Sequence, residues 1–126
     1  MARKLLTRAA GNAVLSPLMR VLEHVDDRRA NLLRVLTYHD LDPDSGFAEQ
    51  MELVARRYRV VSAEEVLEAL GGGPPLAPRA LLITFDDAYR SFETIAWPVL
   101  ERLGLPAVLF VPSAFPGRPE RVFWSA

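Results

Sequence analysis

A six-residue apolar segment, residues 80–85, places the tightest constraint on the fold of this chain. It reads Ala-Leu-Leu-Ile-Thr-Phe and is followed at once by Asp86 and Asp87. An almost unbroken apolar run of this length is typical of a parallel strand that is covered on both faces. The sequence therefore predicts a buried strand with two carboxylates at its carboxyl end.

Strand-like and helix-like segments alternate along the rest of the chain. Further strands are expected at 34–39, 59–61 and 107–111, and the first and last of these are expected to be buried. Helices are expected between the strands, where apolar residues recur at intervals of three or four. This alternation predicts parallel β-α-β units with right-handed crossovers, and therefore an α/β fold.

Two of the expected helices have clear apolar faces. The first begins near Ser45, and its face is formed by Phe47, Met51, Val54 and Tyr58. The other ends at Gly104, and its face is formed by Phe92, Ile95, Ala96, Val99, Leu100 and Leu103. Pro98 is expected near the start of that helix or at a kink, because proline lacks the N–H that a helix interior needs.

A third expected helix follows Ser62 and has a recognisable start signal. The Ser62 hydroxyl can cap the helix, and Glu65 can return a hydrogen bond to the capping residue's N–H. Gly71 is expected to end the helix and to open a connecting loop rich in glycine and proline. The residues expected to face inward are Val66, Leu67 and Leu70.

Composition narrows the possible functions. The net charge of -1 provides no overall field that would select nucleic acid as a partner. The chain has no cysteine, which excludes disulfides, thiolate zinc sites and cysteine nucleophiles, and His24 and His39 are its only histidines. No apolar run approaches the roughly 20 residues that span a bilayer.

Residues 1–33 are predicted to form a basic amphipathic helical leader ahead of the main domain, residues 34–126. Ser16 can cap a helix that has Pro17 in its first position. We expect this helix to pack on the domain, with contact to an anionic membrane surface as the alternative. Polar residues interrupt the apolar core that a signal peptide needs, which favours a cytoplasmic or membrane-peripheral location.

Two adjacent carboxylates at the end of a buried strand need compensation, because each loses hydration and the pair repels. The carboxyl ends of parallel strands are also where α/β proteins bind ligands. Two interpretations of Asp86 and Asp87 follow from the residues alone. Either side chain could cap the next helix, or both could hold magnesium for phosphoryl transfer.

The segment Thr84-Phe-Asp-Asp-Ala88 resembles the first motif of the polysaccharide deacetylase family, the NodB-like carbohydrate esterases, which usually reads Thr-Phe-Asp-Asp-Gly. The resemblance extends through most of residues 34–124, in the same order and spacing. Its further pieces are Tyr38-His39, Phe47 with the helix after it, Tyr58 to Ser62, and Leu103 to Pro112. By this resemblance, residues 34–126 are the N-terminal part of such a domain.

The resemblance implies an irregular (β/α) barrel and a metal-dependent hydrolase that removes acetyl groups from a polysaccharide or amino sugar. Asp86 would be the general base that takes a proton from the attacking water. Asp87 would bind the divalent cation, usually zinc, which polarises the acetyl carbonyl. Tyr38 and His39 would line the substrate pocket, close to both aspartates.

This sequence departs from the family pattern at two points. Ala88 replaces the usual glycine, and its methyl group could hinder a turn that needs a positive φ. The pair of histidines that completes the family's metal site does not occur in this sequence. We therefore expect the chain to be truncated, to hold metal poorly, to be inactive alone and to self-associate. The alternative is a non-catalytic half domain that binds carbohydrate or pairs with another chain.

Overall fold

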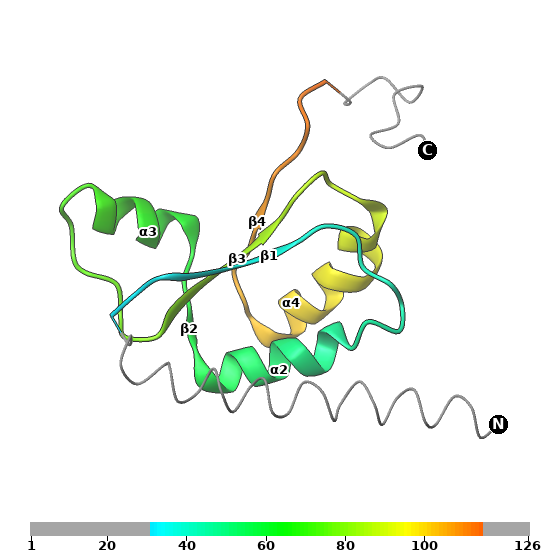
Figure 1. Ribbon diagram of the computed structural model, residues 1–126, viewed down its shortest axis with the longest axis horizontal. Helices are drawn as coiled ribbons and strands as arrows, with labels where there is room; N and C mark the ends of the chain where they lie inside the picture. The colour runs from blue at the N-terminus through cyan, green and yellow to red at the C-terminus, as the bar shows by residue number, and fades with distance from the viewer. Residues whose placement is uncertain (1–30, 115–126) are drawn as a thin grey trace. The chain divides into compact units, whose positions relative to one another are not determined.

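Four parallel strands form an open sheet in the computed structural model, which describes residues 31–114 (Figure 1). The strands are β1 (Arg34–Tyr38), β2 (Arg59–Val60), β3 (Ala80–Phe85) and β4 (Val108–Leu109). Helices connect them, so the predicted α/β fold with parallel strands alternating with helices is confirmed. Most of the predicted leader, His24 and the last twelve residues lie outside the described residues.

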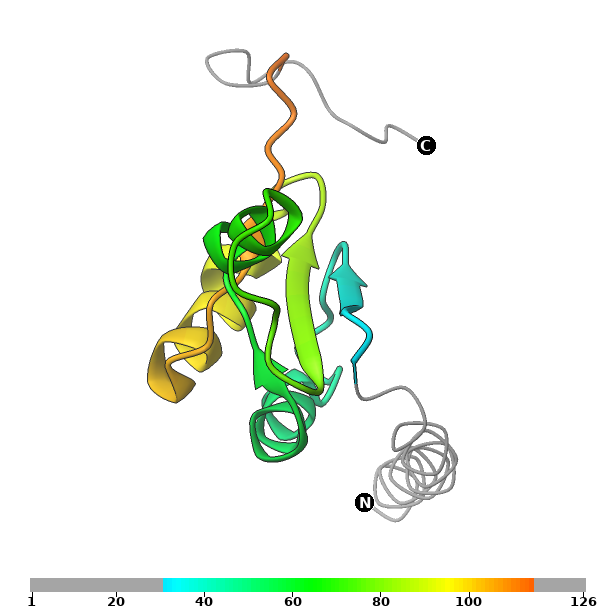
Figure 2. The same cartoon turned by 90° about the vertical axis from the view of Figure 1, so that its left-hand side faces the viewer.

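β3 lies at the centre of the sheet (Figure 2). β1 pairs with it along one side, from Arg34 opposite Leu81 to Tyr38 opposite Phe85. The prediction that this strand is buried is wrong, because β1 lies at the edge of the sheet and alternates half-buried with exposed residues. On the other side of β3, β2 pairs with its beginning and β4 with its end. β3 is buried along almost its whole length because it has neighbours on both sides, as its apolar sequence predicts.

One face of the sheet packs against two helical segments. Leu81, Ile83 and Phe85 alternate along β3 and join a core with α2 (Phe47–Arg57) and with the η2–α4 segment. Period-two alternation places these three side chains on the same face of the strand. Figure 1 shows α2 and α4 together on one side of the sheet, away from α3.

α2 buries the apolar face that the sequence predicts. Phe47, Met51 and Val54 are almost fully buried. The helix begins at Phe47, slightly later than expected, and Gly46 before it has a φ of 69°. Glycine adopts this left-handed conformation without steric cost, which allows the loop to turn directly into the helix.

The predicted helix that ends at Gly104 consists of a π-helical turn, η2 (Phe92–Ala96), and an α-helix, α4 (Trp97–Leu103). Pro98 lies in the first turn of α4, directly after the π-helical turn, where proline's missing N–H interrupts the regular helical hydrogen-bond pattern. Gly104 ends α4 with a φ of 63°. The predicted positions of both residues are therefore confirmed.

α3 (Ala63–Leu70) has the predicted start but not the predicted packing. Ser62 Oγ accepts a hydrogen bond from the Glu65 N–H, and Glu65 returns one to the Ser62 N–H. None of the helix's residues is buried, and Leu67 and Leu70 are 66% and 79% exposed. The prediction that Leu67 and Leu70 face inward is wrong for the described residues, because no other described element packs extensively on this helix, whereas Val66 is half-buried.

The predicted buried strand at 107–111 is also wrong in part. β4 covers only Val108 and Leu109, which are half-buried, and Phe110 and Val111 are exposed. β4 pairs with the end of β3, and no described strand lies along its outer edge. Among the described helices, none combines the length and apolar character needed to cross a membrane.

Candidate functional site

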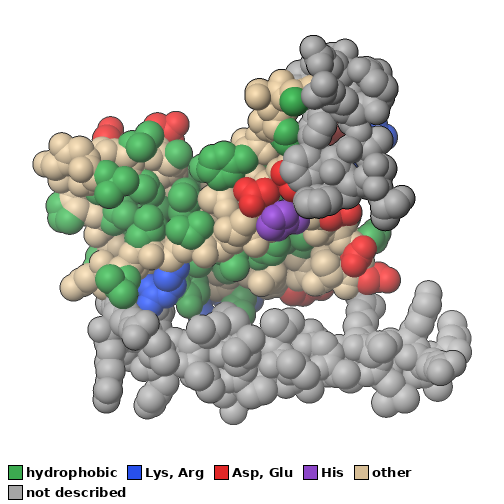
Figure 3. Space-filling model, turned by 45° about the horizontal axis from the view of Figure 1, so that its top comes forward, with side chains coloured by type: hydrophobic (Ala, Val, Ile, Leu, Met, Phe, Trp, Pro, Cys, Tyr) green, Lys and Arg blue, Asp and Glu red, His purple; other side chains and the backbone are tan. Residues whose placement is uncertain are grey.

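The carboxyl ends of β1 and β3 bring His39 and Asp86 together. Tyr38 pairs with Phe85, and the Asp86 N–H donates to the Tyr38 carbonyl oxygen at 2.9 Å. The next side chains are therefore neighbours, with His39 Nε2 3.5 Å from Asp86 Oδ2. Figure 3 shows the histidine beside acidic side chains on the surface. The expected closeness of His39 to the aspartate motif is confirmed for Asp86.

Both side chains of this pair are open to solvent. The side chain of His39 is 61% exposed and that of Asp86 is 36% exposed. Exposed ion pairs contribute little to stability, because solvent screens the attraction and ordering the side chains costs entropy. The pair is therefore better suited to contact with a ligand than to holding the sheet together.

Asp87 and Ala88 form a strained turn immediately after Asp86. Their φ angles are 67° and 50°, both in the left-handed region. Aspartate visits this region more readily than most residues, whereas alanine does so at a cost. The turn thus needs the positive φ that makes glycine usual in the family, and Ala88 adopts it despite its methyl group.

Neither aspartate caps the next helix. The next helical segment begins at Arg90, ahead of η2, and among residues 31–114 no backbone N–H of its first turn donates to either aspartate side chain. Asp87 forms no hydrogen bond or ion pair within residues 31–114. The interpretation of Asp86 or Asp87 as a helix cap is therefore wrong.

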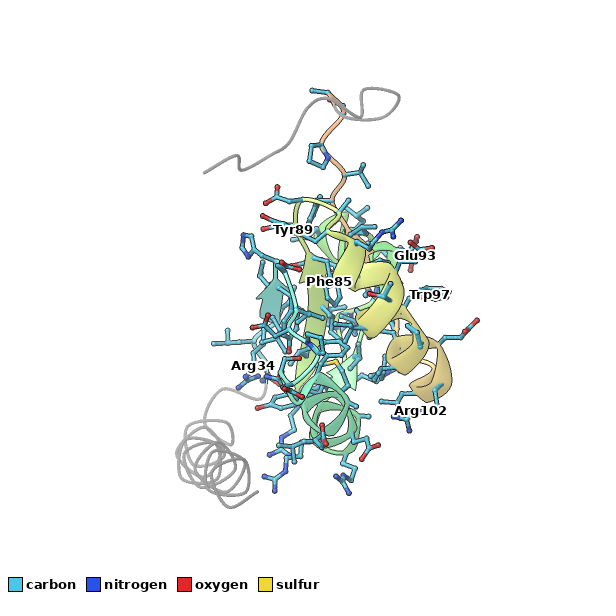
Figure 4. All side chains as sticks on the ribbon, turned by 90° about the vertical axis from the view of Figure 1, so that its right-hand side faces the viewer. Arg34, Phe85, Tyr89, Glu93, Trp97 and Arg102 are labelled. Carbon is cyan, nitrogen blue, oxygen red and sulfur yellow. The ribbon has the colours of Figure 1, made fainter. Side chains whose placement is uncertain are left out.

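An aromatic cluster supports the turn from inside the domain. Phe85 is 1% exposed, stacks on Tyr38 with ring centroids 5.3 Å apart, and meets the edge of Phe92 at 4.9 Å. Figure 4 shows Phe85 between the sheet and the η2–α4 segment, with Tyr89 at the opposite end of the domain from Arg34. Because Phe85 directly precedes Asp86, this packing fixes the point at which β3 ends.

Tyr38 belongs to this cluster through its ring. Its hydroxyl is buried and has no hydrogen-bond partner within the described part of the chain. Burial raises the pKa of Tyr38 well above its ordinary value, because the charged phenolate would lose hydration. The predicted role of Tyr38 in lining a substrate pocket stays a prediction.

Asp40 and Ser91 form a second polar link beside the pair, which we call the Asp40–Ser91 link. The Ser91 hydroxyl donates to Asp40 Oδ1 at 2.6 Å, and the Leu41 N–H donates to both side chains at 3.0 Å. Sequence reasoning missed both residues. The one available signal was that Asp40 follows His39 and Ser91 follows the aspartate motif at short range.

The described residues do not by themselves fit a metal ion. Within residues 31–114, no group of three or more histidines and carboxylates is close enough to hold one. His39 and Asp86 are close to each other, but divalent zinc needs several preoriented ligands. Asp87 can therefore be at most one member of a ligand set.

Comparison with known proteins finds similarity between part of this chain and deacetylases. No family model matches the chain. A poly-beta-1,6-N-acetyl-D-glucosamine N-deacetylase of Escherichia coli K12 is 45% identical over 51 residues, which are 40% of this chain and 8% of that protein. The same protein of Escherichia coli O157:H7 matches equally well. The chain thus spans a small part of the curated relatives it matches.

Solved structures agree with this match. IcaB from Ammonifex degensii is 33% identical with a TM-score of 0.58, over 63% of this chain and 37% of that one. The BpsB deacetylase domain from Bordetella bronchiseptica is 26% identical with a TM-score of 0.59, over 71% and 40%. A de-N-acetylase from Aggregatibacter actinomycetemcomitans shares the fold, with a TM-score of 0.62 at 22% identity over 75% and 43%.

The curated relatives are named as N-deacetylases, and the Bordetella structure is named as a deacetylase domain. The open parallel sheet fits part of their α/β architecture. Sequence motif, fold and relatives agree: over the matched residues the chain is similar to the N-terminal part of polysaccharide deacetylases.

Proposed function

We propose that this chain carries the general base of a hydrolase that removes N-acetyl groups from a polysaccharide. The observation that supports this most is the His39–Asp86 pair at the carboxyl ends of β1 and β3. The curated relatives are named as N-deacetylases of poly-beta-1,6-N-acetyl-D-glucosamine, and the solved structures include de-N-acetylases. An N-acetylated amino-sugar polymer is therefore the substrate class to test first.

Asp86 is the proposed general base. Its carboxylate is partly exposed, so a water molecule can reach it. The resemblance of Thr84-Phe-Asp-Asp-Ala88 to the first motif of polysaccharide deacetylases implies the same role. The water would attack the acetyl carbonyl carbon while Asp86 takes its proton, and the resulting tetrahedral species would release acetate. General-base assistance of this kind contributes about 10²- to 10⁴-fold to a rate.

His39 is the proposed source of the proton for the departing amine. Amide hydrolysis requires that the sugar nitrogen be protonated as the carbon–nitrogen bond breaks, because an amide anion is a poor leaving group. His39 is exposed and its Nε2 is 3.5 Å from Asp86, so one substrate group can contact both side chains. Histidine is the side chain used most often for such transfers.

Asp87 is the proposed metal ligand of this chain. Its carboxylate has no described partner, which leaves it available to a cation, and carboxylate oxygen is a common zinc ligand. Because the described residues supply no complete ligand set, the other ligands would have to come from outside residues 31–114. We therefore propose that residues 31–114 alone do not sustain the reaction.

Acetate release tests this function. The substrate is an oligosaccharide of β-1,6-linked N-acetylglucosamine, assayed with zinc, with cobalt and with a chelator. In the whole protein, Asp86→Asn should lower kcat by at least about 10²-fold. The matched control is Asp42→Asn, an exposed carboxylate in the loop after β1, which should change kcat little.

Two results would contradict the proposal. Unchanged acetate release by Asp86→Asn would remove the general base from the mechanism. Chelator-sensitive turnover by residues 31–114 alone would show that this segment holds a complete metal site.

A further inference from the structure

We propose that Asp40 and Ser91 are positioning residues that hold His39 against Asp86. The inference rests on the function proposed above, because it assigns the Asp40–Ser91 link to the same site. It concerns residues that touch neither substrate nor metal. Their effect would pass through the backbone on either side of His39.

The contacts of the His39 side chain are too weak to fix its rotamer. It is 61% exposed, and its contact with Asp86 at 3.5 Å lies beyond ordinary hydrogen-bond length. An exposed side chain with one weak contact samples several rotamers unless its backbone is fixed. The position of His39 therefore depends on how firmly its neighbours in sequence are tied to the segment that carries Asp86.

Such ties exist on both sides of His39. On the amino-terminal side, the Tyr38 carbonyl oxygen accepts a hydrogen bond from the Asp86 N–H at 2.9 Å. On the carboxyl-terminal side, the Leu41 N–H donates to Ser91 Oγ at 3.0 Å, across 50 positions of sequence. Both ties run from the segment around His39 to the segment that begins at Asp86.

The second tie is built around a short, charge-assisted hydrogen bond. Ser91 Oγ donates to Asp40 Oδ1 at 2.6 Å and at the same time accepts from the Leu41 N–H. Ser91 is 9% exposed, so water competes weakly for its hydroxyl. Because Leu41 is also part of the core, the residues after His39 are anchored by packing as well.

The placement of Ser91 argues against an ordinary helix-capping role. Serine before a helix usually accepts a hydrogen bond from a backbone N–H of the first turn. Ser91 makes no such bond, because it is not before the helix: the helical segment begins at Arg90, and Ser91 has helical angles, φ -61° and ψ -22°. Its hydroxyl is committed instead to the loop after β1, which is the arrangement that a positioning role needs.

Loss of the link should affect the reaction more than the fold. Catalytic groups must be held within a few tenths of an ångström, and a displacement of about 1 Å can reduce a rate by about 10²-fold. Ser91→Ala removes the donor to Asp40 and one acceptor for Leu41, while Leu41 keeps Asp40 Oδ1. The expected result is a domain that folds but holds His39 loosely.

The experiment compares Ser91→Ala with Ser91→Thr, which retains a hydroxyl, and with Thr94→Ala as control. The Thr94 hydroxyl donates only to the Arg90 carbonyl oxygen of its own helical segment, at 3.2 Å. The first readout is nuclear Overhauser contact between the His39 ring and the Asp86 side chain in the isolated chain. The second is the exchange rate of the Leu41 amide proton.

Ser91→Ala should weaken the His39–Asp86 contact and speed Leu41 exchange by about fivefold, the factor that one typical net hydrogen bond supplies. Ser91→Thr should restore both, and Thr94→Ala should change neither. In the whole protein, Ser91→Ala should lower kcat by about tenfold or more with little change in KM. An unchanged His39–Asp86 contact in a folded Ser91→Ala variant would overturn the inference.

Two additions keep the test decisive. If Ser91→Ala does not fold, Asp40→Asn replaces it, because the amide oxygen can still accept from Ser91 but the charge is gone. A normal contact in folded Asp40→Asn with a normal kcat would then count against the link. The two proposals fail in different measurements. If Asp86→Asn leaves acetate release unchanged, the proposed function fails. The His39–Asp86 contact measured in Ser91→Ala still decides whether Ser91 positions His39.

Discussion

Replacing Ala88 by glycine should stabilise the domain, although it removes a methyl group. Ala88 has a φ of 50°, and an L-residue other than glycine pays roughly 1–2 kcal/mol in the left-handed region. Glycine avoids that cost but loses more conformational entropy on folding, which offsets about 0.4–1 kcal/mol. The expected net gain in the free energy of unfolding is about 0.5–1 kcal/mol.

Thermal unfolding measures this gain directly. For a domain of this size, about 1 kcal/mol shifts the melting temperature by about 4–8 °C, so Ala88→Gly should raise Tm by about 3–6 °C. The matched control is Ala55→Gly, on the exposed side of α2, where the backbone is helical. That change should lower stability by about 1 kcal/mol, because glycine is unfavourable inside a helix.

The opposite signs of these two alanine-to-glycine changes make the reasoning testable. Ala88→Val should destabilise the domain, because a β-branched side chain tolerates positive φ poorly. If Ala88→Gly lowered Tm as Ala55→Gly does, the turn after Asp86 could not have the left-handed backbone described above. The strain argument for Ala88 would then have to be abandoned.

Three further changes test other parts of the structure. Tyr38→Phe should be neutral or stabilising, because it removes a buried hydroxyl that has no described partner. Burial raises the folded-state pKa of Tyr38 above its unfolded value, so the stability tied to its neutral form is fully present below about pH 10 and is lost as the pH rises further. Melting at pH 8 and pH 11 should therefore show a smaller alkaline loss for Tyr38→Phe than for the natural chain, and equal losses would contradict the burial of the hydroxyl. Ser62→Ala should cost about 1 kcal/mol in denaturant unfolding, because it removes one half of the capping box; Ser113→Ala, at an exposed position outside any helix, is the control. Leu70→Gln should change the stability of residues 31–114 by no more than about 0.5 kcal/mol, since this side chain is 79% exposed, and a loss near 2 kcal/mol would show that α3 is packed.

Much of the local structure could be predicted from short stretches of sequence. The strand at 80–85 and the Ser62 capping box occur at the predicted residues, and α4 ends at Gly104 as expected. Each signal depends on a few neighbouring residues. An apolar run, a serine three positions before a glutamate, and a glycine after a helix act through local sterics and hydrogen bonds.

Burial could not be read from the same patterns. The apolar spacing of α3 predicted an inward face, but its leucines are exposed, and the apolar segment at 107–111 forms only a short, half-buried strand. Periodicity determines which side chains share a face. Whether that face is buried depends on other segments of the chain that pack against it, and local periodicity carries no information about those segments.

The candidate site divides in the same way. The sequence alone determined that two carboxylates follow a buried strand and that Tyr-His follows another, because strand ends are marked locally. Only the tertiary structure decided that His39 lies 3.5 Å from Asp86 and that Asp40 is bonded to Ser91. Those contacts join residues about 50 positions apart, and their distances are set by the parallel register of β1 and β3, which no local pattern encodes.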